Sequence, residues 1–320
     1  MTSRERVIAA IEMRKPDRMP RSFPAPWESD IAGTGPRPSP DGRASNGVDE
    51  WGCIWQNIGV GNLGEVKVHP LTSWDQFPEF NIPDVRDPRR WQTIGSDREK
   101  AGDRFLYGSG VSLYERVHFL RGLENAWLDI YDAPDKLGAL IDLLADMNIA
   151  ILDEYERYGV DALFLCDDWG LQNRLMIRPE SWYAIWQPRY ARVFEAAHAR
   201  GIKTFLHSCG YILDILPGLI DAGLDVAQLD QQMNMGLDAL GRFRGRVTFY
   251  CPVDIQAVMP TGNIPEIRRY CRRMAECLAT PEGGFIADYY GDPAAVGHSR
   301  EAIEAMCDEF ATISREMYGS

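Results

Sequence analysis

Two stretches of sequence decide the fold, and each is a short apolar run followed by polar residues. The first, ALFLCDDWG, spans residues 162–170, and the second, KTFLHSCG, spans residues 203–210. A segment with helical periodicity, Pro179–Arg200, lies between them. A strand, a helix and a second strand in this order form the repeating unit of a parallel sheet. Because parallel strands end at the same edge of a sheet, we expect the polar residues after the two strands to meet.

The same alternation continues from about residue 100 to the C-terminus. It predicts strands at roughly 104–109, 161–167, 202–207, 224–229, 246–251 and 283–288. Helices are predicted at Ala133–Tyr158, Pro179–Arg200, Ile212–Ala222, Pro265–Leu278 and Ser299–Met317. This order is typical of an α/β fold with parallel crossovers.

A closed eightfold barrel and an open doubly wound sheet both fit this order. No Gly-rich dinucleotide fingerprint follows an early strand, and no phosphate loop of the type Gly-x-x-x-x-Gly-Lys is present. Nearly all predicted strands end in polar residues, as barrel strands do where they meet at the mouth. We therefore predict a (β/α)8 TIM barrel.

The first hundred residues have a different pattern. A predicted helix at Ser3–Met13 is followed by Pro-rich and then Trp- and Gly-rich sequence, without the apolar segments of a second core. We expect one domain over residues 1–320. Residues 1–100 would form an N-terminal elaboration that covers the mouth, and residues 101–320 would hold most of the β/α units.

Composition narrows the possible partners and the location. The 320 residues carry a net charge of −13 and contain no basic run, so neither nucleic acid nor an anionic membrane is an expected partner. No stretch is long and apolar enough to span a membrane, and the start has no signal core, so we expect a soluble cytoplasmic protein. The seven scattered cysteines are expected to be reduced.

Three residues at strand ends have the chemistry of zinc ligands. His207 and Cys209 are separated by one residue, and Cys251 follows a later strand, so the three side chains could surround one tetrahedral ion with an open position. Alternatively, Cys251 is only a small buried side chain. Two carboxylates, Asp167 and Asp168, follow the strand before His207; either both are functional or one of them caps a loop.

Other polar side chains are also expected at the mouth. Gln172, Gln228, Asp230, Asp288 and Tyr289 could bind substrate, orient His207 or complete the metal site, or could simply be solvated. The remaining cysteines within predicted strands and helices are interpreted as structural, and they are Cys166, Cys271, Cys277 and Cys307.

Taken together, these residues resemble the uroporphyrinogen decarboxylase superfamily, whose members are β/α barrels. The resemblance rests on segments along nearly the whole chain: Arg4–Val7, Lys15–Pro20, Asp167–Gln172, Met176–Glu180, His207–Gly210, Val253–Gln256 and Gly283–Ile286. The porphyrin decarboxylases carry an Arg-rich N-terminal motif, but the corresponding segment here, Met19–Trp27, has a single arginine. This departure argues against a porphyrin substrate.

The other branch of the superfamily contains methylcobamide:coenzyme M methyltransferases and O-demethylase methyltransferases. Its members bind zinc through a His-x-Cys pair and a distant cysteine, and His207 and Cys209 match the pair. Where the distant cysteine is expected, near Asp288, this sequence has none. We therefore expect Cys251 as the third ligand, with Asp168 or Asp288 as an oxygen donor in the fourth position.

The resemblance implies a zinc-dependent methyltransferase that moves a methyl group between a small methylated substrate and a corrinoid on a partner protein. The substrate would be an aromatic methyl ether, as in O-demethylation, or a methylamine. Asp168 and His207 would be catalytic, and Trp27, Trp51 and Trp55 would wall the pocket. One alternative is a metal-independent decarboxylase or lyase in which Asp168 acts as acid or base. Another is a barrel that binds a ligand without chemistry.

Overall fold

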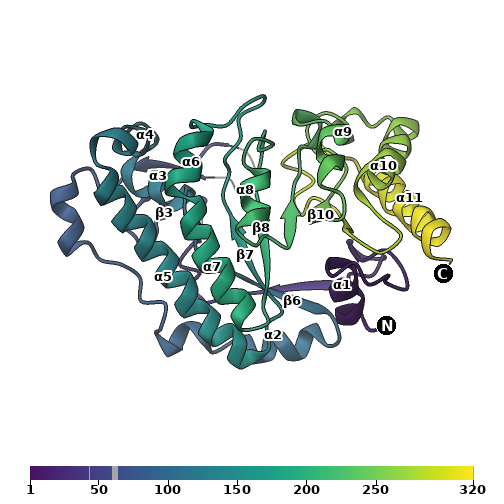
Figure 1. Ribbon diagram of the computed structural model, residues 1–320, viewed down its shortest axis with the longest axis horizontal. Helices are drawn as coiled ribbons and strands as arrows, with labels where there is room; N and C mark the ends of the chain where they lie inside the picture. The colour runs from purple at the N-terminus through teal and green to yellow at the C-terminus, as the bar shows by residue number, and fades with distance from the viewer. Residues whose placement is uncertain (43, 60–63, 320) are drawn as a thin grey trace.

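Eight parallel strands form a nearly closed barrel in the computed structural model, which describes residues 1–42, 44–59 and 64–319. The strands are β1 (Arg21–Ser22), β2 (Ile31–Thr34), β6 (Phe105–Ser109), β7 (Ala162–Cys166), β8 (Lys203–His207), β9 (Val226–Gln228), β10 (Thr248–Cys251) and β11 (Phe285–Asp288). Their order around the barrel is β1-β11-β10-β9-β8-β7-β6-β2. Helices cover the outside (Figure 1). The predicted (β/α)8 TIM barrel is confirmed.

The six strands predicted from residue 100 onward all form, with ends that differ by one or two residues. The sequence does not predict the barrel strands β1 and β2, which lie at the two edges of the sheet, where β1 pairs with β11 and β2 with β6. β1 is only two residues long and β2 contains Gly33, so neither has the alternating β-branched pattern by which strands are recognised.

The helices are α1 (Ser3–Ile11), α2 (Ile94–Ala101), α3 (Glu115–Arg121), α4 (Leu123–Asp132), α5 (Pro134–Tyr158), α6 (Pro179–Ile185), α7 (Gln187–Ala199), α8 (Leu216–Asp221), α9 (Leu237–Leu240), α10 (Ile264–Leu278) and α11 (Arg300–Tyr318). The single helix predicted at Pro179–Arg200 is divided into α6 and α7 near Trp186. Pro188 lies in the first turn of α7, where a missing N–H is tolerated, whereas inside a continuous helix it would remove a hydrogen bond.

The N-terminal segment packs against the rest of the chain in two places. Val7 and Ile11 of α1 pack against the apolar residues of the barrel interior at the amino ends of the strands. A small antiparallel sheet of β3 (Gly47–Val48), β4 (Ile54–Asn57) and β5 (Gly64–Val68) lies beside α3. The ring of Trp55 packs edge-on against Phe119 with centroids 5.0 Å apart. This sheet is therefore at the carboxyl ends of the strands (Figure 1).

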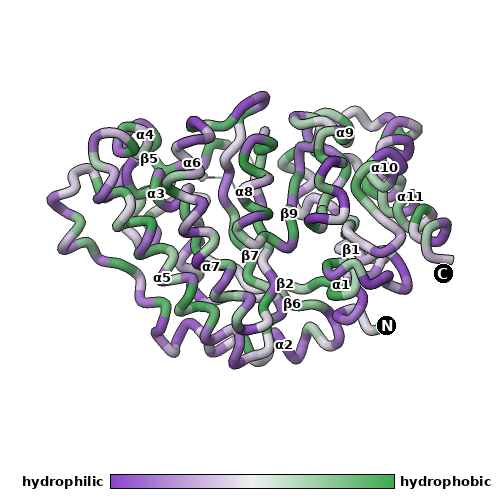
Figure 2. Tube along the Cα trace, in the orientation of Figure 1, coloured by the Kyte–Doolittle hydropathy of each residue, from purple (hydrophilic) through white to green (hydrophobic). Residues whose placement is uncertain are grey.

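Strand residues alternate between two apolar clusters. Phe105, Ala162, Phe205 and Tyr250 face the barrel interior and pack together. The residues between them, such as Leu206, face the much larger cluster shared with the outer helices. Along α5 and α7 apolar and polar residues alternate, as expected for helices with one buried face (Figure 2). In the described part of the chain, no helix combines the length and apolar character needed to cross a membrane.

Candidate metal centre

Asp168, His207 and Cys209 bring three different ligand atoms together at the mouth of the barrel. His207 Nε2 lies 3.3 Å from Asp168 Oδ1 and 3.3 Å from Cys209 Sγ. The three ligand atoms all lie within 4.8 Å of one another. Within residues 1–42, 44–59 and 64–319, no other group of three histidine, cysteine or acidic side chains is this compact.

Hydrogen bonds between the loops after β7 and β8 hold these ligands in place. The backbone N–H of Cys209 donates to Asp168 Oδ1 at 2.8 Å, and that of Trp169 donates to Ser208 Oγ at 3.0 Å. The backbone N–H of Asp167 donates to the carbonyl of His207 at 2.9 Å. Each loop therefore fixes the other, and the ligand positions do not depend on long flexible side chains.

Gly210 makes this close approach possible. Its φ of +74° is in the left-handed region, and a Cβ there would collide with the backbone of Gly170. The backbone N–H of Gly170 in turn donates to the carbonyl of Cys209 at 3.2 Å. The glycine after Cys209 is thus required by the contact between the two loops.

A chain of hydrogen bonds orients the imidazole of His207. Its Nδ1 bonds to Gln228 Oε1, and Gln228 Nε2 donates to Asp230 Oδ1 at 2.6 Å. Because an amide oxygen only accepts, Nδ1 must carry the proton, and Nε2 is left to face Cys209 and Asp168. This arrangement gives a histidine ligand the tautomer and orientation that metal binding through Nε2 needs.

Electrostatics at the site favour a cation. Burial by itself disfavours the imidazolium form of His207. Cys166 and Cys209, when ionised, and the hydrogen bond to Asp168 outweigh burial and raise the pKa of the imidazole well above its usual value. Burial raises the pKa of the Cys209 thiol, although the nearby imidazole opposes the shift. A divalent cation bound here would take the place of the protons that these groups hold.

Asp167 differs from its neighbour Asp168 in every contact. Its carboxylate is fully buried and accepts backbone N–H groups of Leu113, Tyr114 and Glu115 at 2.8–2.9 Å, at the start of α3. The hydroxyl of Tyr190 donates to it at 2.6 Å. Burial raises the pKa of Asp167 to about 7 against these four donors. One of the two carboxylates therefore caps a segment of backbone, as one reading of the sequence had it.

The sequence matches the family Uroporphyrinogen decarboxylase (URO-D) over residues 117–311, more than half of its length. The chain belongs to this family. No curated protein sequence matches it.

Two solved structures extend this family assignment to the fold. A methyltransferase from Methanosarcina mazei has a TM-score of 0.72 at 16% identity, with 98% of this chain and 99% of that chain covered. A B12-independent methionine synthase from Shewanella sp. W3-18-1, solved with selenomethionine, has a TM-score of 0.52 at 12% identity, with 72% and 68% covered. At these identities the likeness shows a shared barrel fold.

In this uroporphyrinogen decarboxylase family member, Cys251 lies apart from the three converging ligands. It is fully buried in the cluster between barrel and helices, and burial raises the pKa of its thiol. Tyr250, one residue earlier, faces the barrel interior, so the alternation of the strand directs Cys251 outward. Asp168 is the third group beside His207 and Cys209.

Cys166 also lies beside the site, although the sequence predicts it to be a structural cysteine. It pairs in register with His207, and it has the same parity in β7 as Ala162 and Phe164, which face the interior. It is partly exposed, and its charge acts on the pKa of His207. Counting back by two from Cys166 to Phe164 and Ala162 would have placed it at the mouth with His207.

The other predicted site residues are spread over several environments. Gln228 and Asp230 belong to the chain that orients His207, whereas Gln172 is exposed in the loop after β7. Asp288 is buried, and burial with the nearby charge of Asp230 raises its pKa well above the usual value. The other three are aromatic: Tyr289 packs against the main apolar cluster, Trp27 Nε1 donates to Asp308 of α11 at 3.3 Å, and Trp51 is buried with its Nε1 on the carbonyl of Pro40.

Proposed function

We propose that this protein is a zinc-dependent methyltransferase that moves a methyl group between a small methylated substrate and a corrinoid carried by a partner protein. The observation that carries the proposal is the convergence of Asp168, His207 and Cys209 at the ends of β7 and β8. One oxygen, one nitrogen and one sulfur form a donor set that suits zinc, and three protein ligands leave a fourth position for a substrate. Aromatic methyl ethers and methylamines are the proposed substrates.

The comparisons support methyl transfer on this fold. The names of two structurally similar proteins, a methyltransferase and a methionine synthase, both denote methyl-transferring enzymes. The corrinoid is proposed because His207 and Cys209 resemble the zinc-binding pair of the coenzyme M and O-demethylase methyltransferases. The near absence of arginine in Met19–Trp27 speaks against a porphyrin, and in the structure Arg18, just before that segment, is paired with Asp30.

The protein's own residues would bind the zinc and orient the side chain of His207. Bound zinc would supply Lewis acidity, either on the ether oxygen of a donor or on the thiol of an acceptor. Gln228 keeps Nε2 of His207 facing the ion, and the partly exposed Asp168 holds its ligand position through the backbone of Cys209. When the methyl group passes to the corrinoid as a cation equivalent, the oxygen or nitrogen to which it was bound keeps the bonding electron pair and takes up a proton from solvent.

The test combines metal content with methyl transfer. Purified protein should contain about one zinc per chain by mass spectrometry. It should also methylate free cob(I)alamin with 2-methoxyphenol or trimethylamine as the methyl donor, and the absorbance of the cobalamin reports this reaction. Chelation should remove both zinc and turnover, and added zinc should restore both. Zinc binding without methyl transfer from any such donor would refute the proposed reaction. Decarboxylation that persists in the chelated protein would instead support the lyase.

A further inference from the structure

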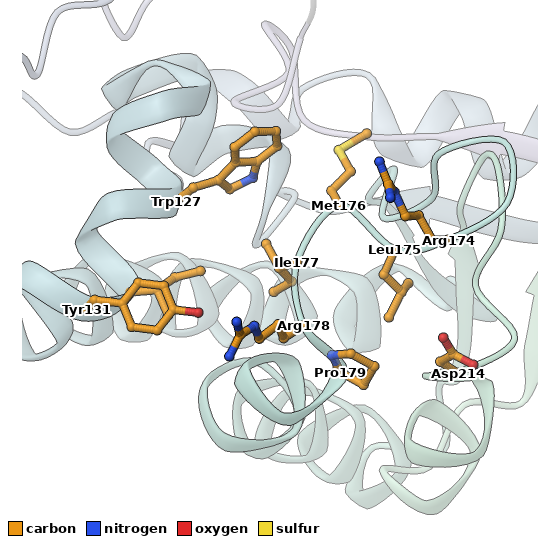
Figure 3. Close-up of a pocket in the computed structure, with 10 residues that line it drawn as sticks. Trp127, Tyr131, Arg174, Leu175, Met176, Ile177, Arg178, Pro179 and Asp214 are labelled. Atoms are coloured by element: carbon orange, nitrogen blue, oxygen red, sulfur yellow. The ribbon is translucent and has the colours of Figure 1, made fainter.

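A cavity lies beside the loops that carry the candidate metal ligands. Its volume is about 440 Å³, within the range of small-molecule pockets. One wall is formed by Trp127, Ile130 and Tyr131 of α4, and the other by residues 174–179 of the loop before and at the start of α6, with Asp214 at one side (Figure 3). None of these residues belongs to the group of Asp168, His207 and Cys209.

Two unpaired arginines give this cavity its charge. The guanidinium groups of Arg174 and Arg178 make no hydrogen bond or ion pair within residues 1–42, 44–59 and 64–319. In the same part of the chain most arginines are paired with carboxylates, in keeping with a net charge of −13. The one acid in the lining, Asp214, accepts a hydrogen bond from the hydroxyl of Tyr211 at 3.0 Å. The cavity is therefore locally positive on an acidic protein.

The rest of the lining is flat and apolar. Tyr131 is 64% exposed, so the face of its ring is accessible to a ligand. Trp127 Nε1 donates to the hydroxyl of Tyr114 at 3.0 Å, so the polar edge of the indole is satisfied. Met176 and Ile177 complete the wall opposite, and Figure 3 shows the guanidinium of Arg178 directed toward Tyr131 across the cavity.

We propose that this cavity, defined by Trp127, Tyr131, Arg174 and Arg178, binds an aromatic carboxylate. A planar ring would stack on the exposed aromatic side chains, and the carboxylate would accept paired hydrogen bonds from a guanidinium group. A ligand with both a ring and a carboxylate would pair with the arginines and cover the apolar wall at the same time. A simple inorganic anion would leave the wall uncovered.

The cavity is connected to the candidate metal centre through both of its loops. The loop with Arg174 starts at Asp168, and the loop with Asp214 starts at Cys209. Gly170 and Leu175 form a bridge that joins the two ends of the first loop. The hydroxyl of Tyr114 donates to Met176 Sδ, and its ring stacks on Trp169 at 3.9 Å. The carboxylate would thus bind against the same loop that presents Asp168.

The test is direct binding, measured by calorimetry and by fluorescence of the tryptophans. Benzoate and 1-naphthoate should bind with 1:1 stoichiometry, and benzamide and acetate, which lack the charge or the ring, should bind at least tenfold more weakly. Replacing the charge by an apolar chain in Arg178→Met should weaken benzoate binding about tenfold, as the loss of a charged hydrogen bond would. The matched control is Arg242→Met, because Arg242 is also exposed and without an ion pair but lies elsewhere.

Two outcomes would overturn the proposal. One is equal binding of benzoate and benzamide by the native protein. The other is full benzoate binding by Arg174→Met/Arg178→Met with a native circular dichroism spectrum. The inference does not rest on methyl transfer, because binding is read without turnover and with zinc present or chelated. A protein that binds benzoate but transfers no methyl group would refute only the proposed reaction.

Discussion

The two sides of the barrel mouth carry similar residues, but these residues lie in different environments. On the β7–β8 side, His207 and Cys209 converge with Asp168, and Cys166 lies in register with His207. On the β10–β11 side, a cysteine again ends a strand, but Cys251 is turned into the apolar layer beneath the helices. A position at the end of a strand is therefore not enough to bring a side chain to the mouth of the barrel. The parity of the residue within the strand decides whether it faces the interior or the helices.

Removing one cysteine from each side should give the largest contrast. Cys209→Ser should lose nearly all zinc, because a three-ligand site without its sulfur binds far more weakly. Cys251→Ser should retain about one zinc per chain, since its Sγ is not among the converging atoms. Both variants would be measured by mass spectrometry after dialysis. Loss of zinc in both would restore Cys251 as a ligand and overturn the comparison.

The adjacent carboxylates should differ in what they stabilise. Asp167→Ala leaves three buried backbone N–H groups without an acceptor and should lower the free energy of unfolding by about 3 kcal/mol or more. Asp168→Ala should change this free energy by only ~1 kcal/mol but weaken zinc binding. Urea unfolding of the metal-free proteins measures the free energy of unfolding of each variant. Equal destabilisation would show that the two residues do the same structural work.

The hydrogen-bond chain behind His207 should matter less than the ligands. Gln228→Leu removes the acceptor for Nδ1 and leaves Nε2 free to lose its orientation. Zinc affinity should fall about tenfold to 100-fold, as for other partners that orient a histidine ligand. Competition with a chromogenic chelator measures the change. The control is Gln172→Leu on the exposed loop after β7, which should bind zinc as the native protein does.

The last expected effect is a dependence of zinc affinity on pH. The pKa of His207 and that of Cys209 are both raised, so at neutral pH the metal-free site holds protons that zinc must displace. Apparent zinc affinity should therefore rise with pH, by up to about tenfold per unit for each proton released. Titrations at several pH values would show this slope in Cys251→Ser as well as in the native protein. A flat profile would contradict protonated ligands at the β7–β8 side.

The sequence predicted the barrel because its strands from β6 onward are apolar, regularly spaced and followed by helices. It predicted His207 and Cys209 because histidine and cysteine one residue apart at a strand end are chemically conspicuous. The sequence alone does not show which of Asp167 and Asp168 is structural and which lies at the site. The N–H groups that surround Asp167 come from residues 113–115, far away in the chain. The sequence also does not predict β1 and β2. These strands form because they pair with neighbouring strands, and their own residues show little strand-like pattern.

The pairing of β1 with β11 has a consequence for biosynthesis. Arg21 pairs with Ala287, so β1 leaves the ribosome long before the strand with which it pairs has been made. Closing such a distant contact is entropically costly and slow. Until then the apolar face of α1, which covers the base of the barrel, has no complete surface to pack against. The nascent chain therefore has to keep α1 and β1 from aggregating until β11 has been made.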